Sequence, residues 1–199
     1  MPRYSERQKV ALDALMKDDT YRHALEIIES DGLQGLTLDR LAKRIGVSRG
    51  SLYNYFADRD AIVDFVEERT FEPLVAVLER IVDGDGSAAA KLGAITNEVL
   101  AAVRENLTVV VALSPEKHSN RDKQSHLRRR ERGLDLLHRV VREGIDKGEF
   151  RELPPDLVSE VLYGAITGLI DNMAYSGEFR KPEEIVPTMM EIFLSGLKR

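Results

Sequence analysis

The sequence predicts an all-α protein, and three observations support this fold class. Apolar residues recur at helical spacing along most of the 199 residues, and alternating β-branched runs are scarce. Residues 108–111 are the best strand candidate, but this run is too short and isolated to build a sheet. Glycine and proline mark the breaks between the expected helices. We expect a small N-terminal three-helix domain, residues 1–60, followed by a larger helical domain, residues 61–199.

The first part of the chain contains two helical patterns, and glycine residues follow each of them. Residues 5–17 are expected to form a short helix or a flexible arm, and residues 20–31 carry the first clear pattern. Thr37 then caps a second helix, and Gly46 ends it because glycine accepts the left-handed backbone that closes many helices.

Two further caps follow in short order. Ser48 is expected to cap a third, short helix that runs to about Phe56, and Asp58 to cap a long fourth helix. This fourth helix contains Pro73, which lacks a backbone donor and clashes with the preceding turn. We therefore expect a kink or break near residues 70–73.

The remaining helices are separated by loops rich in glycine and proline. The clearest loop lies at residues 83–87, where Asp and Gly alternate before Ser87. The helices expected beyond it cover residues 88–105, 107–113, 122–147, 155–176 and 182–197.

The composition is typical of a globular protein, with 43% hydrophobic and 32% charged residues. The absence of cysteine excludes disulfides, thiol catalysis and thiolate metal sites. No apolar run reaches the roughly 18 residues of a transmembrane helix, and the first residues lack the apolar core of a signal peptide. These features predict a cytoplasmic protein without a membrane partner.

Residues 36–60 read LTLDRLAKRIGVSRGSLYNYFADRD, which predicts two helices packed across a tight turn. Val47 lies in the turn and would fill the angle between the helices. The second helix would bury Leu52 and Phe56, which are four residues apart, and present small and polar residues outward. This division is typical of a recognition helix, because small residues let the backbone approach the major groove of DNA.

The charge distribution agrees with a DNA-binding segment. The net charge of the chain is −5, but residues 36–59 contain five basic and two acidic residues and so carry +3. A basic island on an acidic body can bind phosphate locally.

This segment resembles the TetR family of transcriptional regulators, and the resemblance extends from Tyr21 to Phe65. The matching residues are Leu36-Thr37, Leu41-Ala42, Ile45-Gly46-Val47-Ser48, Gly50-Ser51-Leu52-Tyr53, Tyr55-Phe56 and Asp58-Arg59. The rest of the chain is similar to the family only in pattern and helix count.

The resemblance implies roles for eight residues, and the outward face of the second helix adds a ninth. Arg49, Gly50 and Ser51 occupy positions that read bases, and the fork of Arg49 can pair with guanine O6 and N7. Tyr53 is similar to a groove-facing tyrosine, and Asn54 shares the outward face. The positions that usually hold phosphates are Thr37, Ser48, Tyr55 and Arg59; lysine is commoner than arginine at the last.

Other interpretations of this segment remain open. The two helices are alternatively a hairpin within a core, in which Tyr53 and Tyr55 are core aromatics. Arg49 is alternatively a phosphate or solvent contact. The segment before the first helix is either a basic arm for the minor groove, with Arg3, Arg7 and Lys9, or a disordered tail.

The last two helices are expected to mediate dimerisation. The apolar stripe of residues 155–176 is too wide for one buried face, and its glycines lie four residues apart. The resemblance implies that these helices pair with those of a second copy in a four-helix bundle. The candidate interface residues are Val161, Gly164, Gly168, Met189 and Phe193. The alternative is that both helices are simply core and that the glycines allow close packing within the chain.

The resemblance also implies an effector cavity within the C-terminal helices. The candidate lining residues are Leu100, Val103, Leu107, Val110, Leu113, Tyr163, Thr167, Asp171, Asn172 and Tyr175. The alternative is that most of them are plain core. Three of them, Thr167, Asp171 and Asn172, are polar residues on an otherwise apolar helix and need polar partners if they are buried.

No arrangement typical of an enzyme is found. The four histidines show no i, i+4 pairing, and the nucleotide-binding and serine-nucleophile motifs are missing. We expect neither a metal nor a cofactor. The run of Arg128, Arg129 and Arg130 is interpreted as a solvated helix surface, with an anionic ligand or a second DNA contact as alternatives.

Together these patterns predict a homodimeric repressor that binds a palindromic operator and is released by a small-molecule effector. Two copies of a short recognition helix are needed because one reads few bases. The alternatives are an activator or ligand-independent regulator, a small-molecule-binding helical protein with a vestigial helix-turn-helix, and a purely structural interaction protein.

Overall fold

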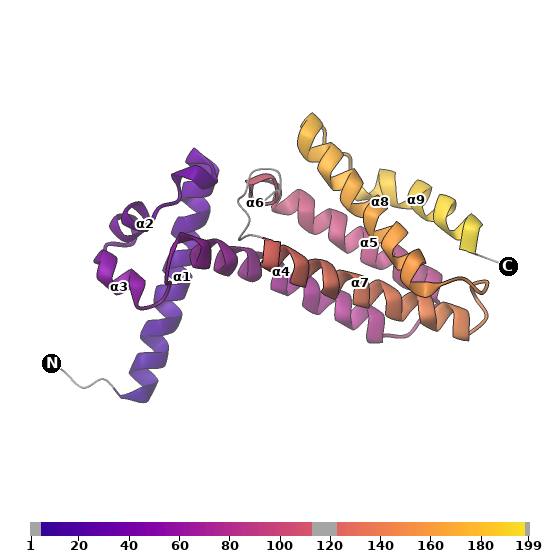
Figure 1. Cartoon of the computed structure of the whole chain (residues 1–199), viewed down its shortest axis with the longest axis horizontal. Coiled ribbons are helices and arrows are strands. Elements are labelled where there is room, and N and C mark those ends of the chain that lie inside the picture. Colours follow the sequence, from indigo (N-terminus) through magenta and orange to yellow (C-terminus); the bar gives the residue numbers. More distant parts are fainter. Residues whose placement is uncertain (1–4, 113–122, 198–199) are drawn as a thin grey trace. The chain divides into compact units, whose positions relative to one another are not determined.

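The computed structural model describes residues 5–112 and 123–197, which are helical almost throughout and contain no strand (Figure 1). The helices are α1 (Glu6–Asp31), α2 (Leu38–Ile45), α3 (Arg49–Tyr53), α4 (Arg59–Asp83), α5 (Ala88–Glu105), α6 (Leu107–Ala112), α7 (Lys123–Asp146), α8 (Pro155–Ser176) and α9 (Pro182–Leu197), with a 3-10 turn, η1 (Leu33–Gly35), after α1. The predicted all-α class is confirmed. Within the described ranges, no helix has both the length and the apolar character needed to cross a membrane.

The chain divides into two compact units, and the division falls inside α4 between Thr70 and Phe71. The first unit contains α1 to α3 and the beginning of α4, and the second contains the rest of α4, α5, most of α6, and α7 to α9. The unit boundary therefore lies ten residues beyond the end of the predicted first domain, residue 60. The predicted kink or break at Pro73 is not a break, because α4 continues through this residue.

The first helix is longer than the sequence pattern indicated. Ser5 and Gln8 form a capping box at its start, in which each side chain bonds the other residue's backbone. No glycine or proline interrupts residues 6–31, so the predicted arm and the predicted helix of residues 20–31 are one helix. The interpretation of the N-terminal segment as a disordered tail is wrong from Glu6 onward, and Arg3 lies outside the described residues.

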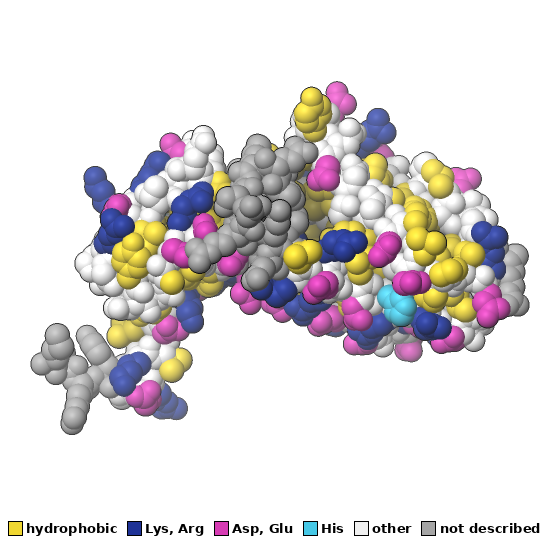
Figure 2. Space-filling view, viewed as in Figure 1, with side chains coloured by type: hydrophobic (Ala, Val, Ile, Leu, Met, Phe, Trp, Pro, Cys, Tyr) yellow, Lys and Arg dark blue, Asp and Glu magenta, His cyan; other side chains and the backbone are white. Residues whose placement is uncertain are grey.

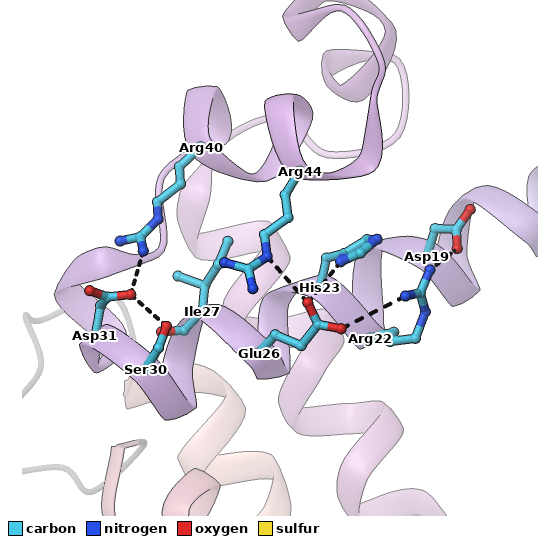
Figure 3. Close-up of polar contacts among 9 residues, drawn as sticks. All are labelled: Asp19, Arg22, His23, Glu26, Ile27, Ser30, Asp31, Arg40 and Arg44. Atoms are coloured by element: carbon cyan, nitrogen blue, oxygen red, sulfur yellow. Dashed lines mark hydrogen bonds and ion pairs between the residues drawn. The ribbon is translucent and has the colours of Figure 1, made fainter.

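Ion pairs fasten α2 to α1 (Figure 3). Arg40 bonds Asp31, and Arg44 donates from Nε to Glu26 Oε2 at 3.2 Å. His23 on α1 lies 3.0 Å from the same carboxylate and, with Arg44, holds the pKa of Glu26 below its usual range. Two arginines of the predicted basic island therefore serve to position α2.

The second unit buries an apolar core among α4, α5, α7, α8 and α9. Its largest fully buried side chains are Leu92, Val140, Val141, Phe150 and Leu162. A charged side chain, Lys91, is also buried there, at 5% exposed, and its ammonium donates to Val82 O at 2.9 Å and to Glu143 Oε2 at 2.8 Å. The buried charge is thus paired, and it ties α5 to both α4 and α7.

Candidate nucleic-acid interface

Two N-caps and a glycine terminator fix the helix ends of the helix-turn-helix in residues 37–53. Thr37 Oγ1 accepts from Arg40 N at the start of α2, and Ser48 Oγ accepts from Ser51 N at the start of α3. Between them, Gly46 takes the left-handed conformation, with φ 82° and ψ 27°, that turns the chain. The two predicted N-caps and the predicted terminator are confirmed.

The two faces of α3 differ in exposure as the pattern predicts. Leu52 is fully buried and Phe56 nearly so, whereas Arg49, Gly50 and Tyr53 are exposed. The helix ends at Tyr53, three residues earlier than predicted, because Asn54 N turns back to the carbonyls of Ser51 and Leu52. The fourth helix is capped as predicted, since Asp58 Oδ1 accepts from Ala61 N at 2.9 Å.

The structure brings most of the predicted DNA-binding residues to the surface of one unit. Exposed positions are Thr37, Ser48, Arg49, Gly50, Tyr53 and Asn54, and half-buried positions are Ser51, Tyr55 and Arg59. Figure 2 shows dark blue basic side chains near α2, with magenta acidic side chains among them. A small basic surface that carries a short exposed helix matches what a major-groove reader needs.

Arg49 is held on this surface by neighbours on both helices. Its Nη1 donates to both carboxylate oxygens of Asp39 at 2.9 Å, and its Nη2 donates to Tyr53 Oη at 3.0 Å. The guanidinium carbon also lies 5.4 Å from the centre of the Tyr53 ring. The tyrosine hydrogen bond and the Asp39 charge raise the pKa of Arg49, so its positive charge is secure. Sequence reasoning assigned no role to Asp39.

Arg59, which is predicted to contact a phosphate, also makes hydrogen bonds within the protein. Its Nε donates to Leu36 O at 2.8 Å, and its Nη2 donates to Leu33 O at 2.7 Å. These bonds fix the start of α4 against the segment that leads into α2. The interactions of a charged donor with two carbonyls are directional and stronger than neutral hydrogen bonds, so Arg59 has a structural role within this unit.

The predicted dimer residues fall into two groups. On α8, Val161 is 55% exposed, and a Cβ added at Gly164 or Gly168 would meet no atom within 4 Å. The glycines therefore do not serve close packing within the chain. On α9, Met189 is buried in the core of its own chain and Phe193 is half-buried against that core.

The exposed face of α8 includes three residues that were predicted to line the effector cavity. Tyr175 is 91% exposed, and Asp171 and Asn172 are exposed, so these three do not line an interior cavity of the single chain. Leu157, which is 56% exposed, lies on the same face of α8 and was not among the predicted interface residues. On α9, Ile192 is also exposed, at 67%. Apolar side chains are visible along α8 in Figure 2.

The other predicted effector-binding residues lie inside or partly inside the second unit, apart from Leu113, which is outside the described residues. Leu100 and Val103 are buried; Leu107, Val110, Tyr163 and Thr167 are half-buried. The hydroxyl of Thr167 is satisfied within its own helix, because it donates a hydrogen bond to Tyr163 O at 3.0 Å. Burial raises the pKa of the Tyr163 phenol, while the charges of Arg129 and Arg130 act in the opposite direction.

Two family models match the chain. Residues 21–66 match the model for bacterial regulatory proteins of the tetR family, and residues 85–197 match a tetracyclin repressor-like C-terminal domain. Together they cover both the helix-turn-helix and the C-terminal helices, including the part for which the sequence pattern was least specific.

Curated relatives and solved structures agree with these matches. The fatty acid metabolism regulator protein of Bacillus subtilis is 23% identical over 87% of this chain and 91% of its own length, and the regulator SrpR of Pseudomonas putida is 24% identical over 81% and 74%. The Bacillus subtilis FadR structure, solved in complex with stearoyl-CoA, superposes with a TM-score of 0.78 at 20% identity, covering 89% of this chain and 97% of that chain. The chain therefore belongs to the TetR family of DNA-binding transcriptional regulators, which are not enzymes.

Proposed function

We propose that this protein is a homodimeric repressor that binds a palindromic operator and leaves it when a small molecule binds. The observation that carries the proposal is the surface of α3, where Arg49, Gly50 and Tyr53 are exposed while Leu52 anchors the helix from beneath. A helix held this way can enter the major groove without unpacking from its domain. The repressor role is supported by relatives named as repressors, among them the tetracycline repressor of class C.

Arg49 is proposed to read a base, so replacing it should change specificity as well as affinity. Arg49→Ala is expected to weaken binding to the operator by about 1–3 kcal/mol and to relax the preference at one base position in each half-site. Titration of the variant against operators substituted at each position measures both effects. Arg22→Ala, at an exposed arginine of α1 that pairs with Asp19, is the control for loss of a positive charge. An equal loss on every operator variant would make Arg49 a phosphate contact instead.

The proposed dimer uses the exposed face of α8. Leu157, Val161, Gly164 and Gly168 follow one another at helical spacing, and the missing side chains of the glycines allow another helix to approach closely. An apolar face with such spacing is costly to leave in water along a whole helix, so a second copy is its expected partner. Two-fold symmetry of the dimer then matches a palindromic site.

The proposed effector is a long-chain acyl-CoA. The similarity to regulators named for fatty acid metabolism supports this class, as does the neighbour solved with stearoyl-CoA. Apolar residues such as Leu100 and Val103 would take the acyl chain, and the arginines near Tyr163 would take anionic groups. The effector must bind the DNA-free conformation more tightly, because a ligand of equal affinity for both conformations shifts nothing.

Fluorescence anisotropy of the operator complex tests the effector. Stearoyl-CoA at saturation is expected to lower operator affinity at least about 10-fold, which corresponds to about 1.4 kcal/mol of coupling. Coenzyme A and stearate, supplied separately, are the matched controls for the two halves of the ligand. Operator affinity that stays constant with stearoyl-CoA would contradict this effector class while leaving DNA binding intact.

A further inference from the structure

The recognition surface contains an acidic side chain that competes with DNA for Arg49. Asp39 lies in the first turn of α2 and accepts both hydrogen bonds from Arg49 Nη1 across the turn that joins the two helices. The remaining terminal nitrogen, Nη2, donates to Tyr53. Both terminal nitrogens of the guanidinium are therefore engaged before any nucleic acid arrives.

This pair is accessible to DNA. The side chain of Arg49 is 53% exposed and that of Asp39 is 67% exposed. The ion pairs between α2 and α1 have a different role from the pair of Asp39 with Arg49. Arg40 and Arg44 bind carboxylates of α1 and thereby position α2. Asp39 instead faces a side chain of the recognition helix, and its charge cancels that of Arg49 on the surface proposed to meet DNA.

We infer that Asp39 is a positioning residue that withholds Arg49 from the phosphates of non-cognate DNA and releases it to a cognate base. This inference rests on the proposed function of α3 as a recognition helix. An exposed ion pair is worth only a few-fold in an equilibrium constant, which is comparable with one phosphate contact in water. A bidentate contact with the correct base is worth roughly 5- to 150-fold, so it overcomes the pair where a single phosphate does not.

The consequence is that Arg49 contributes little to the binding of random DNA until the charge of Asp39 is removed. The test combines Asp39→Asn, Arg49→Ala and the double variant in a cycle, with affinity for a random duplex measured across a range of salt concentrations. Asp39→Asn is expected to tighten binding several-fold at low salt and to steepen the salt dependence by about 0.9, the value for one additional phosphate. Arg49→Ala alone is expected to weaken binding to random DNA slightly, because the charge of Asp39 then faces the phosphates without its partner. The gain from Asp39→Asn is expected to be much smaller in the Arg49→Ala background than in the wild type.

Two further variants separate this role from a structural one. Asp19→Asn removes the same charge from α1, where Asp19 pairs with Arg22, and should leave the salt dependence unchanged. Asp39→Glu keeps the charge and should restore the wild-type slope. Thermal unfolding of each variant checks that the unit remains folded, and Asp39→Ser replaces Asp39→Asn if the latter unfolds.

The outcomes distinguish this inference from the function on which it rests. Equal salt slopes for the wild type and Asp39→Asn, in a protein that binds DNA, would overturn the role of Asp39 alone. Weaker operator binding by Asp39→Asn would also overturn it, because Asp39 would then support Arg49 in the complex. Absence of salt-dependent binding by the wild type would overturn both the inference and the proposed function.

Discussion

A Val161→Glu variant is expected to be monomeric and to lose about 100-fold or more in operator affinity. Val161 is 55% exposed on the α8 face, so a glutamate there is solvated in the single chain and leaves its fold intact. In a dimer, the same carboxylate would be buried against a second copy without a partner, which is strongly unfavourable. Separating the two recognition helices then removes the gain from binding two half-sites together, which is typically 10²- to 10⁴-fold.

Light scattering and operator titration test this prediction together. Leu127→Glu is the matched control, because Leu127 is an exposed apolar residue of α7 in the same unit. The control should remain dimeric and bind normally. A Val161→Glu protein that is still dimeric with wild-type operator affinity would show that the α8 face has another use.

Gly144→Ala is expected to destabilise the protein by about 3 kcal/mol, the upper end of the usual cost of overpacking a core. A Cβ at this position would overlap the ring of Phe150 and lie 2.8 Å from the Cβ of Ala88. Phe150 is 1% exposed, and its backbone N bonds Gly144 O at 3.0 Å, so the ring has no space into which to move. The substitution therefore strains the contact between α7 and the start of α5.

Denaturant unfolding measures this difference. Gly93→Ala is the control within α5, because the nearest atom to its added Cβ is Met190 Cγ at an ordinary 3.8 Å. Alanine is favoured over glycine in a helix interior by up to about 1 kcal/mol, so this control should be neutral or stabilising. Unfolding free energies that agree for the two variants would contradict the packing around Gly144.

Local sequence signals predicted the helices where one residue decides the boundary. Thr37, Gly46 and Ser48 each act through bonds within three or four residues, and the structure places them as expected. The C-terminal helices were also predicted to within one residue at their described ends. The start of α1 also has a local cause, because Ser5 and Gln8 form a capping box there. These two residues are a signal for a helix start that the predicted boundary at residue 20 did not include.

Contacts between distant residues were not predictable in the same way. The carbonyls that bind Arg59 lie 23 and 26 residues earlier in the chain, and their direction depends on how η1 leads into α2. The pairing of Asp39 with Arg49 spans ten residues across the turn. Helical periodicity indicated that α8 had two apolar sides, but it did not distinguish the buried Leu162 from the exposed Val161 beside it in the stripe.

A binding selection of the purified protein against random duplex DNA at two salt concentrations tests operator recognition by this protein most directly. Enrichment of one palindromic sequence is expected, with half-sites about 34 Å apart if they are separated by one helical turn, and with weaker binding at the higher salt. Recovery of no enriched sequence, with no dependence of binding on salt in the presence or absence of cell extract, would contradict operator recognition.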